Sequence, residues 1–103
     1  MSWIDAGAVA ALEEQTSIGA DLDGEPVRVV RCDGEILAVA DVCTHDGAPL
    51  DDAEVEACQI ICPRHGARFC LRTGEALTPP AYEPLRTYAV RIDAGRILIE
   101  RPD

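Results

Sequence analysis

The stretch from Cys43 to Gly66, CTHDGAPLDDAEVEACQIICPRHG, contains two short motifs that decide how the sequence is interpreted. Each motif pairs one thiol with one imidazole: Cys43 is followed by His45, and Cys62 is followed by His65. The chain has only 2 histidines, and both lie in these motifs. Because thiolates and imidazoles are metal ligands, the pattern predicts a metal site built from two loops.

Three interpretations of the motifs compete. Two cysteines and two histidines can hold a structural zinc, but zinc modules usually pair like ligands, whereas each motif here mixes them. The four residues can also be unrelated, with no metal. A 2Fe–2S cluster with two thiolates on one iron and two imidazoles on the other suits the mixed motifs, because each loop then reaches both irons. The mixing favours the cluster, and zinc stays as the alternative.

The sequence on either side of the motifs favours β-strands. Residues 26–32 and 36–40 are β-prone and flank Asp33-Gly34, which predicts a hairpin. Residues 87–92 alternate and lead through a turn at 93–95 into residues 96–100, which predicts a second hairpin.

Two details of these segments can be tested against the structure. In the alternating run, Tyr88, Val90 and Ile92 are expected on one face of a strand. Residues 6–14 are expected to form a short helix or an irregular lead-in.

Residues 42–80, between the hairpins, differ in composition. They hold both histidines, four of the cysteines and four of the 7 prolines, together with many turn signals. At 103 residues the chain is the size of one domain. We therefore predict a small β-domain, the base (about 1–41 and 81–103), with an inserted loop-rich lobe (about 42–80).

The charge balance is strongly acidic, with 9 Lys and Arg against 19 Asp and Glu and a net charge of −10. Such a chain repels a phosphate backbone, so the charge argues against nucleic-acid binding, and no nucleic-acid partner is expected. The first residues have neither a basic n-region nor an apolar h-region, and no apolar run is long enough to span a bilayer. The expected location is the cytoplasm, where an odd number of cysteines indicates metal ligands or buried thiols.

The motifs and the residues after them resemble the Rieske family. The run CPRHGARFCLRTGEAL (62–77) and the following Pro79-Pro80-Ala81 are similar to ferredoxin components of bacterial aromatic-ring-hydroxylating dioxygenases. The resemblance implies an all-β Rieske fold: an antiparallel β-sandwich or barrel-like base with an inserted cluster-binding subdomain. It also implies one 2Fe–2S cluster, with Cys43 and Cys62 on the inner iron and His45 and His65 on the exposed outer iron.

The resemblance extends to residues around the cluster. Gly47 and Gly66 would let backbone N–H groups approach the sulfides, and Pro79-Pro80 would form a loop packed against the cluster. Ordinary turns explain these four residues equally well. The remaining cysteines, Cys32, Cys58 and Cys70, are expected to be small buried hydrophobes.

Departures from the wider family predict a low reduction potential. Rieske proteins of respiratory complexes carry a disulfide-forming cysteine after each motif, where this chain has Ala48 and Arg64. Ala67 stands near the place of a serine that hydrogen-bonds the cluster in those proteins. Fewer donors to cluster sulfur lower the potential, so we expect roughly −150 mV rather than +300 mV.

The family resemblance implies an electron carrier and not an enzyme. Rieske oxygenases need a second iron held by histidines and a carboxylate, and this chain has no histidine to spare. The expected partners are a flavin-dependent ferredoxin reductase and a terminal oxygenase, met transiently by a monomer, with no membrane involved. The alternatives are a small subunit of a nitrite reductase-type assembly and a zinc-bound interaction module.

Overall fold

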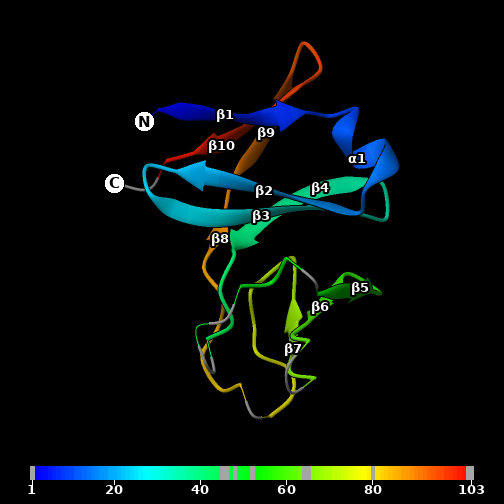
Figure 1. The fold of residues 1–103 in the computed structure, drawn as a ribbon, viewed down its shortest axis with the longest axis vertical. Coiled ribbons are helices and arrows are strands. Elements are labelled where there is room, and N and C mark those ends of the chain that lie inside the picture. The colour runs from blue at the N-terminus through cyan, green and yellow to red at the C-terminus, as the bar shows by residue number, and fades with distance from the viewer. Residues whose placement is uncertain are drawn as a thin grey trace.

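The structure, a computed structural model, describes residues 2–44, 47, 49–51, 53–63, 66–79 and 81–101. In this part of the chain three antiparallel sheets are accompanied by one short helix, α1 (Ala11–Glu14) (Figure 1). The expected all-β class is confirmed. No helix among the described residues is long and apolar enough to cross a membrane.

Two of the sheets form the base, in the upper half of Figure 1. One has the order β1 (Trp3–Ala8), β10 (Arg96–Glu100), β9 (Val90–Asp93), and the other has the order β2 (Ser17–Leu22), β3 (Glu25–Cys32), β4 (Glu35–Ala40), β8 (Thr87–Tyr88). One apolar core joins them, formed by Leu12, Leu22, Val27, Val29, Ala38, Ile97 and Ile99. Burying alternate apolar side chains of both sheets is what holds such a sandwich together.

The third sheet lies in the lobe, in the lower half of Figure 1. Its order is β5 (Glu54–Glu56), β6 (Gln59–Ile61), β7 (Arg68–Cys70). A second core surrounds it, with Leu50, Ile60 and Phe69 fully buried, and this core includes Val30 and Val39 of the base. The lobe therefore packs onto the base, while the exact limits proposed for it stay a prediction.

The first predicted hairpin is confirmed as β3 and β4, which pair from Val27↔Ala40 to Cys32↔Glu35. The helix expected within 6–14 is shorter, and a strand, β1, comes before it. Neither β1 nor β2 has a strong apolar alternation, since small and charged residues interrupt both. Their pairing with β10 and β3 makes them strands, and a local pattern does not reveal such partners.

The prediction that 87–92 forms one continuous strand is wrong, because β8 and β9 are separate strands. The chain changes sheets at Ala89: Tyr88 pairs with Ala38, whereas Val90 pairs with Ile99. Ile92 is 48% exposed, so it does not share the burial of Val90. The predicted face is kept across the change of sheet: Tyr88 and Val90 both pack against the base core, and Ile92 pairs with the core residue Ile97.

Candidate metal centre

Cys43 and Cys62 lie deep in the core of the lobe. Each is only 1% exposed, and both belong to the cluster of buried side chains that surrounds Phe69. Cys43 follows the end of β4 closely, and Cys62 follows β6 directly. Two regular strands therefore deliver two thiols into one apolar environment. Cys62 is a free thiol, and Cys43 is not part of the disulfide described below.

The same backbone hydrogen bond closes both motifs. The N–H of Gly47 donates to the carbonyl of Cys43 at 2.7 Å, and the N–H of Gly66 donates to the carbonyl of Cys62 at 3.0 Å. The glycines have φ values of +74° and +73°, which residues with a Cβ adopt only at a cost. The predicted need for glycine thus has a conformational cause. Whether other N–H groups face a sulfide stays a prediction, since these two N–H groups donate to carbonyls.

Further hydrogen bonds hold each loop in place. The Thr44 hydroxyl, next to Cys43, donates to the carbonyl of Glu83 at 2.7 Å. The N–H of Cys62 donates to the carbonyl of Ala67 at 2.8 Å, which closes the second loop. Both cysteine positions are therefore fixed by partners outside their own turns.

A buried ion pair anchors the first loop to the base. Asp41, directly after β4, binds the guanidinium of Arg28 at 2.8 and 3.3 Å, and both side chains are buried. The same carboxylate accepts the N–H of Leu50 at 3.0 Å. Sequence analysis missed this pair. The available signal was Arg28, which stands between Val27 and Val29 in the valine-rich strand β3, because a charge in a buried strand needs a partner.

A third loop, which contains the described residues 76–79 and 81–85, contacts the first motif, since Glu83 accepts the Thr44 hydroxyl. The N–H of Arg68 donates to the Thr78 hydroxyl at 2.9 Å, and the N–H of Leu85 donates to the carbonyl of Gly74 at 2.7 Å. A Cβ on Gly74 would collide with the carbonyl oxygen of Leu85, so only glycine permits this approach. The loop is fixed at both ends.

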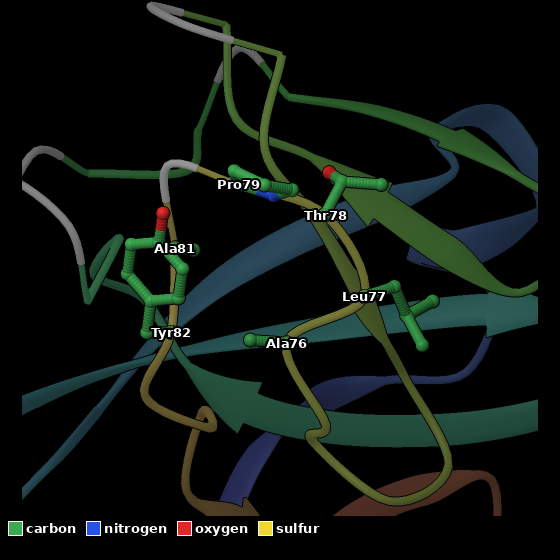
Figure 2. Close-up of a pocket in the computed structure, with 6 residues that line it drawn as sticks. All are labelled: Ala76, Leu77, Thr78, Pro79, Ala81 and Tyr82. Atoms are coloured by element: carbon green, nitrogen blue, oxygen red, sulfur yellow. The ribbon is translucent and has the colours of Figure 1, made fainter.

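The loop carries a shallow surface hollow of about 170 Å³. Its lining is Ala76, Leu77, Thr78, Pro79, Ala81 and Tyr82 (Figure 2). Tyr82 is 82% exposed, which is unusual for a large aromatic side chain. Pro79, one of the two prolines predicted to pack against the cluster, is exposed at this hollow, and Pro80 lies outside the described residues.

The imidazole half of the predicted ligand set is not described. His45 and His65 lie outside the described residues, as do Ala48 and Arg64. Among the described side chains no three His, Cys, Asp or Glu come together as a metal site. A cavity of about 290 Å³ borders Cys62, Pro63 and Gly66. Two buried thiols on matching loops, one of them beside open volume, fit the thiolate half of an iron–sulfur site.

Comparison with known proteins decides the family. The model of the Rieske [2Fe-2S] domain matches residues 2–89. The chain belongs to the Rieske family. The cofactor is therefore one Rieske 2Fe–2S cluster, and the zinc alternative is excluded. Bound there, the cluster supplies one-electron redox chemistry at an iron pair with unequal ligands.

Several of the similar proteins are ferredoxins of oxygenase systems. The 3-phenylpropionate/cinnamic acid dioxygenase ferredoxin subunit of Escherichia coli K12 is 42% identical in an alignment of 110 positions, gaps included, which covers 100% of this chain and 97% of that protein. The ferredoxin of carbazole 1,9a-dioxygenase from Nocardioides aromaticivorans IC177 has a TM-score of 0.91 and 31% identity, covering 99% and 100% of the two chains.

One solved structure is a complex of reduced oxygenase and oxidised ferredoxin in carbazole 1,9a-dioxygenase. Its matching chain has a TM-score of 0.87 and 28% identity, with 94% of this chain and 91% of that chain covered. The likeness extends over nearly the whole of both chains, so it includes the base as well as the lobe. These relatives are electron carriers and not catalysts, as the sequence predicted.

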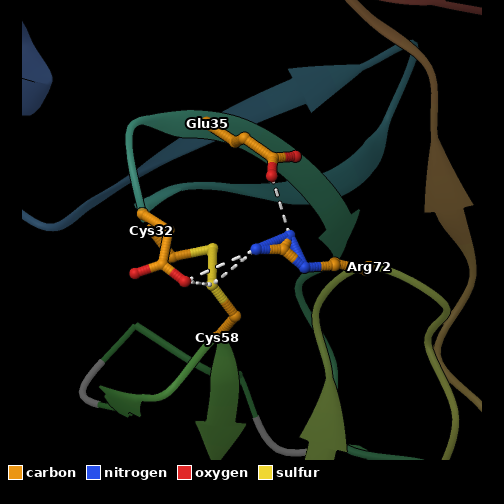
Figure 3. Close-up of polar contacts among 5 residues, drawn as sticks. Cys32, Glu35, Cys58 and Arg72 are labelled. Carbon is orange, nitrogen blue, oxygen red and sulfur yellow. Dashed lines mark hydrogen bonds and ion pairs between the residues drawn. A yellow bond between two sulfur atoms is a disulfide. The ribbon is translucent and has the colours of Figure 1, made fainter.

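The expectation for the other three cysteines is partly wrong. Cys32 and Cys58 are nearly buried, but they form a disulfide (Figure 3). Cys70 is a half-buried thiol whose pKa is lowered, chiefly by a hydrogen bond from the Thr73 side chain. The β-prone sequence around each residue predicted burial, but a partner 26 residues away leaves no local signal.

Proposed function

We propose that this protein is the electron-carrying ferredoxin of an aromatic-ring dioxygenase system. It accepts one electron from a flavin-dependent reductase and passes it to a terminal oxygenase. The observation that carries this proposal is the end-to-end likeness to ferredoxin components, which holds for a relative in sequence and for a carrier in structure. The named relatives favour a dioxygenase system over a nitrite reductase-type assembly.

We further propose that Cys43 and Cys62 bind the inner iron and that His45 and His65 bind the outer iron. Support comes from the residues on either side of each histidine. Each motif begins at a buried cysteine and ends at an exposed glycine, Gly47 or Gly66, whose N–H donates to the carbonyl of that cysteine. An imidazole between those two points is suited to an outer iron close to the surface, where an electron can leave.

The surface beside the motifs suits a brief encounter with a partner. Tyr82 and Leu77 expose apolar area on the third loop, whose Glu83 accepts the Thr44 hydroxyl, and the net charge of −10 attracts a basic face. Redox partners usually bury little area, so that each can leave after the transfer. We propose that the protein acts as a monomer in the cytoplasm.

Metal content and spectroscopy test the cofactor and its ligands together. We expect two irons and two sulfides per chain, and a reduced EPR signal whose average g lies below that of an all-cysteine cluster. The variants H45C and H65C should lose that signal, whereas C70S should keep it, because Cys70 is not a proposed ligand. A colourless protein with one zinc would contradict the proposal.

Electron transfer tests the role. With a flavin-dependent reductase and a terminal oxygenase of a dioxygenase system, the purified protein should restore substrate oxidation in proportion to its concentration. A protein that the reductase reduces but that never reoxidises on any such oxygenase would contradict the proposed place between the two.

A further inference from the structure

The disulfide between Cys32 and Cys58 joins the base to the lobe. Cys32 is the last residue of β3, and Cys58 lies in the turn between β5 and β6. Their Cα atoms are 5.5 Å apart, which is within the range that a disulfide spans. The bond therefore ties the tip of a base hairpin to the tip of a lobe hairpin (Figure 3).

The turn that holds Cys58 differs from comparable turns in the described chain. In the hairpins β2–β3, β3–β4 and β9–β10 the two turn residues have positive φ, and the second is Gly24, Gly34 or Gly95. In the hairpin β5–β6 the turn residues also have positive φ, but the second residue is Cys58, with φ +56°.

Glycine is the favoured residue at that turn position because a Cβ makes positive φ costly. A cysteine there, following Ala57 at φ +51°, puts two residues with a Cβ in the left-handed region. Such a conformation persists only where the surrounding structure holds it. The bond to Cys32 is one constraint on this turn, beside the β5–β6 pairing and the hydrogen bond from the N–H of Leu71 to the carbonyl of Cys58, and strained positions of this kind gather at functional sites.

Charged side chains surround the bond. Arg72 donates from Nη2 to Sγ of Cys58 at 3.5 Å and pairs with Asp33 at 3.5 Å and with Glu35 at 2.9 Å. The Asp33 carboxylate also lies 3.5 Å from Sγ of Cys58. A guanidinium beside a sulfur favours the thiolate that forms when a disulfide is cleaved, while the two carboxylates offset part of that effect.

We propose that Cys32 and Cys58 form a second redox site, a two-electron dithiol–disulfide pair whose state controls how firmly the lobe is held to the base. A stable disulfide is uncommon in the cytoplasm, where most are catalytic or redox-sensing; this step rests on the cytoplasmic location proposed above. The co-reactant is a dithiol of the cellular thiol-reducing systems.

The chemistry is thiol–disulfide exchange. One thiolate of the dithiol attacks Sγ of Cys32, the bond between the two Sγ atoms breaks, and Cys58 leaves as a thiolate beside Arg72. The second thiol of the reagent then attacks the mixed disulfide, Cys32 leaves as a thiolate, and the reagent ends as its own disulfide. Two electrons and two protons pass to the protein, which ends with two thiols.

Strand β6 connects the disulfide to a proposed cluster ligand. Cys58 precedes this strand, and the proposed ligand Cys62 follows it, while the carbonyl of Cys58 accepts the N–H of Leu71 at 2.9 Å. Opening the bond removes this constraint on the Cys58 turn. The lobe then depends on the Arg72 ion pairs and on core contacts, so the cluster should be released more readily.

Thiol counting on the cluster-loaded protein tests the redox pair. The protein is equilibrated without oxygen in mixtures of reduced and oxidised dithiothreitol, quenched in acid, alkylated and analysed by peptide mass spectrometry. We expect Cys32 and Cys58 to become alkylated together, reversibly, as the reduced fraction rises. Alkylation of both in fully oxidised buffer would show that no bond forms, and protection of both in fully reduced buffer would show an inert bond. Either result overturns the proposal.

Cluster release tests the coupling to the lobe. In reduced dithiothreitol the visible absorbance of the native protein should decay about tenfold faster than in oxidised dithiothreitol, which corresponds to about 1.4 kcal/mol in activation free energy. The variant C32S/C58S should decay at the fast rate in both buffers, and C70S should behave as the native protein does. Equal decay of the native protein in both buffers would overturn the coupling. Thiol counts do not depend on electron transfer, so this failure differs from failure of the carrier role.

Discussion

Asp41 and Arg28 form a buried, two-point ion pair at the junction between the base and the first motif loop. Asp41 is placed there by its own N–H, which donates to the carbonyl of Pro26 at 3.0 Å. Its carboxylate in turn holds the N–H of Leu50, whose side chain is fully buried in the lobe. One residue therefore connects β3, the end of β4 and the far side of the loop that contains Cys43.

Removal of one partner should be costly. The variant D41A leaves the Arg28 guanidinium buried without a counter-charge and should lower the free energy of unfolding by about 3–5 kcal/mol. The double variant R28M/D41L removes both charges and should recover most of that loss. Denaturant unfolding of the cluster-free proteins measures both.

The exposed pair Asp5–Arg96 is the matched control, with two hydrogen bonds of 2.9 Å. Because solvent screens it, D5A should lower the free energy of unfolding far less than D41A does. Equal losses in D41A and D5A would show that burial does not set the value of the Arg28–Asp41 pair.

Cys70 should react as an activated thiol. Its pKa is lowered by a hydrogen bond from Thr73, which outweighs the opposing effect of burial. A lowered pKa leaves more thiolate at any pH below the ordinary value, so alkylation of Cys70 should reach its plateau at lower pH than a free cysteine does. The alkylation rate of Cys70 is followed against pH by mass spectrometry. The pH at which this rate reaches its plateau should be higher in T73V and unchanged in T73S. An unchanged profile in T73V would contradict this assignment.

How much of the structure can be predicted from the sequence depends on whether a feature is set by neighbouring residues or by residues far along the chain. The hairpin β3–β4 was predictable because β-prone runs and Asp33-Gly34 act locally. The change of sheet at Ala89 was not, because alternation does not specify which sheet receives a strand. A local sequence pattern therefore predicts the alternation of a strand more readily than it predicts which strands pair with it.

The same difference between local and long-range signals applies to the site. The two motifs predicted the family through residue types at fixed spacing, and the comparisons confirm it. The Cys32–Cys58 bond and the Arg28–Asp41 pair join residues distant in sequence, and each is visible only once the chain is folded. The assignment of the four ligands remains a prediction, with both histidines outside the described residues.

The glycine of the second motif should matter for cluster retention beyond its effect on stability. G66A places a Cβ at φ +73° in open space, so it should cost about 1–2 kcal/mol and distort the turn at Cys62. We expect the visible absorbance to decay several times faster in G66A. The control is G34A, with φ +76° and equally open space but at a hairpin of the base. Equal decay in both variants would show that general destabilisation is the cause.

The Thr44 hydroxyl should position the first loop. T44V removes the hydrogen bond to the Glu83 carbonyl, which should cost about 1 kcal/mol and loosen the loop next to Cys43. The reduced EPR spectrum should broaden in T44V as the loop samples more than one arrangement, whereas T44S keeps a hydroxyl and should retain a narrow spectrum. A native line shape in T44V would show that the turn at Gly47 suffices to fix the loop.

Tyr82 should act in partner recognition. It is 82% exposed, so Y82A should change the free energy of unfolding by no more than about 0.5 kcal/mol. It also flanks the hollow on the third loop, where an aromatic ring offers a partner apolar area at little entropic cost. We therefore expect Y82A to raise the ferredoxin concentration needed for half-maximal oxygenase activity about fivefold or more and to leave the maximal rate almost unchanged. The matched control is I92A, which removes a 48% exposed apolar side chain from β9 on the base. If I92A weakens the encounter as much as Y82A does, exposed apolar area in general and not the third loop governs docking.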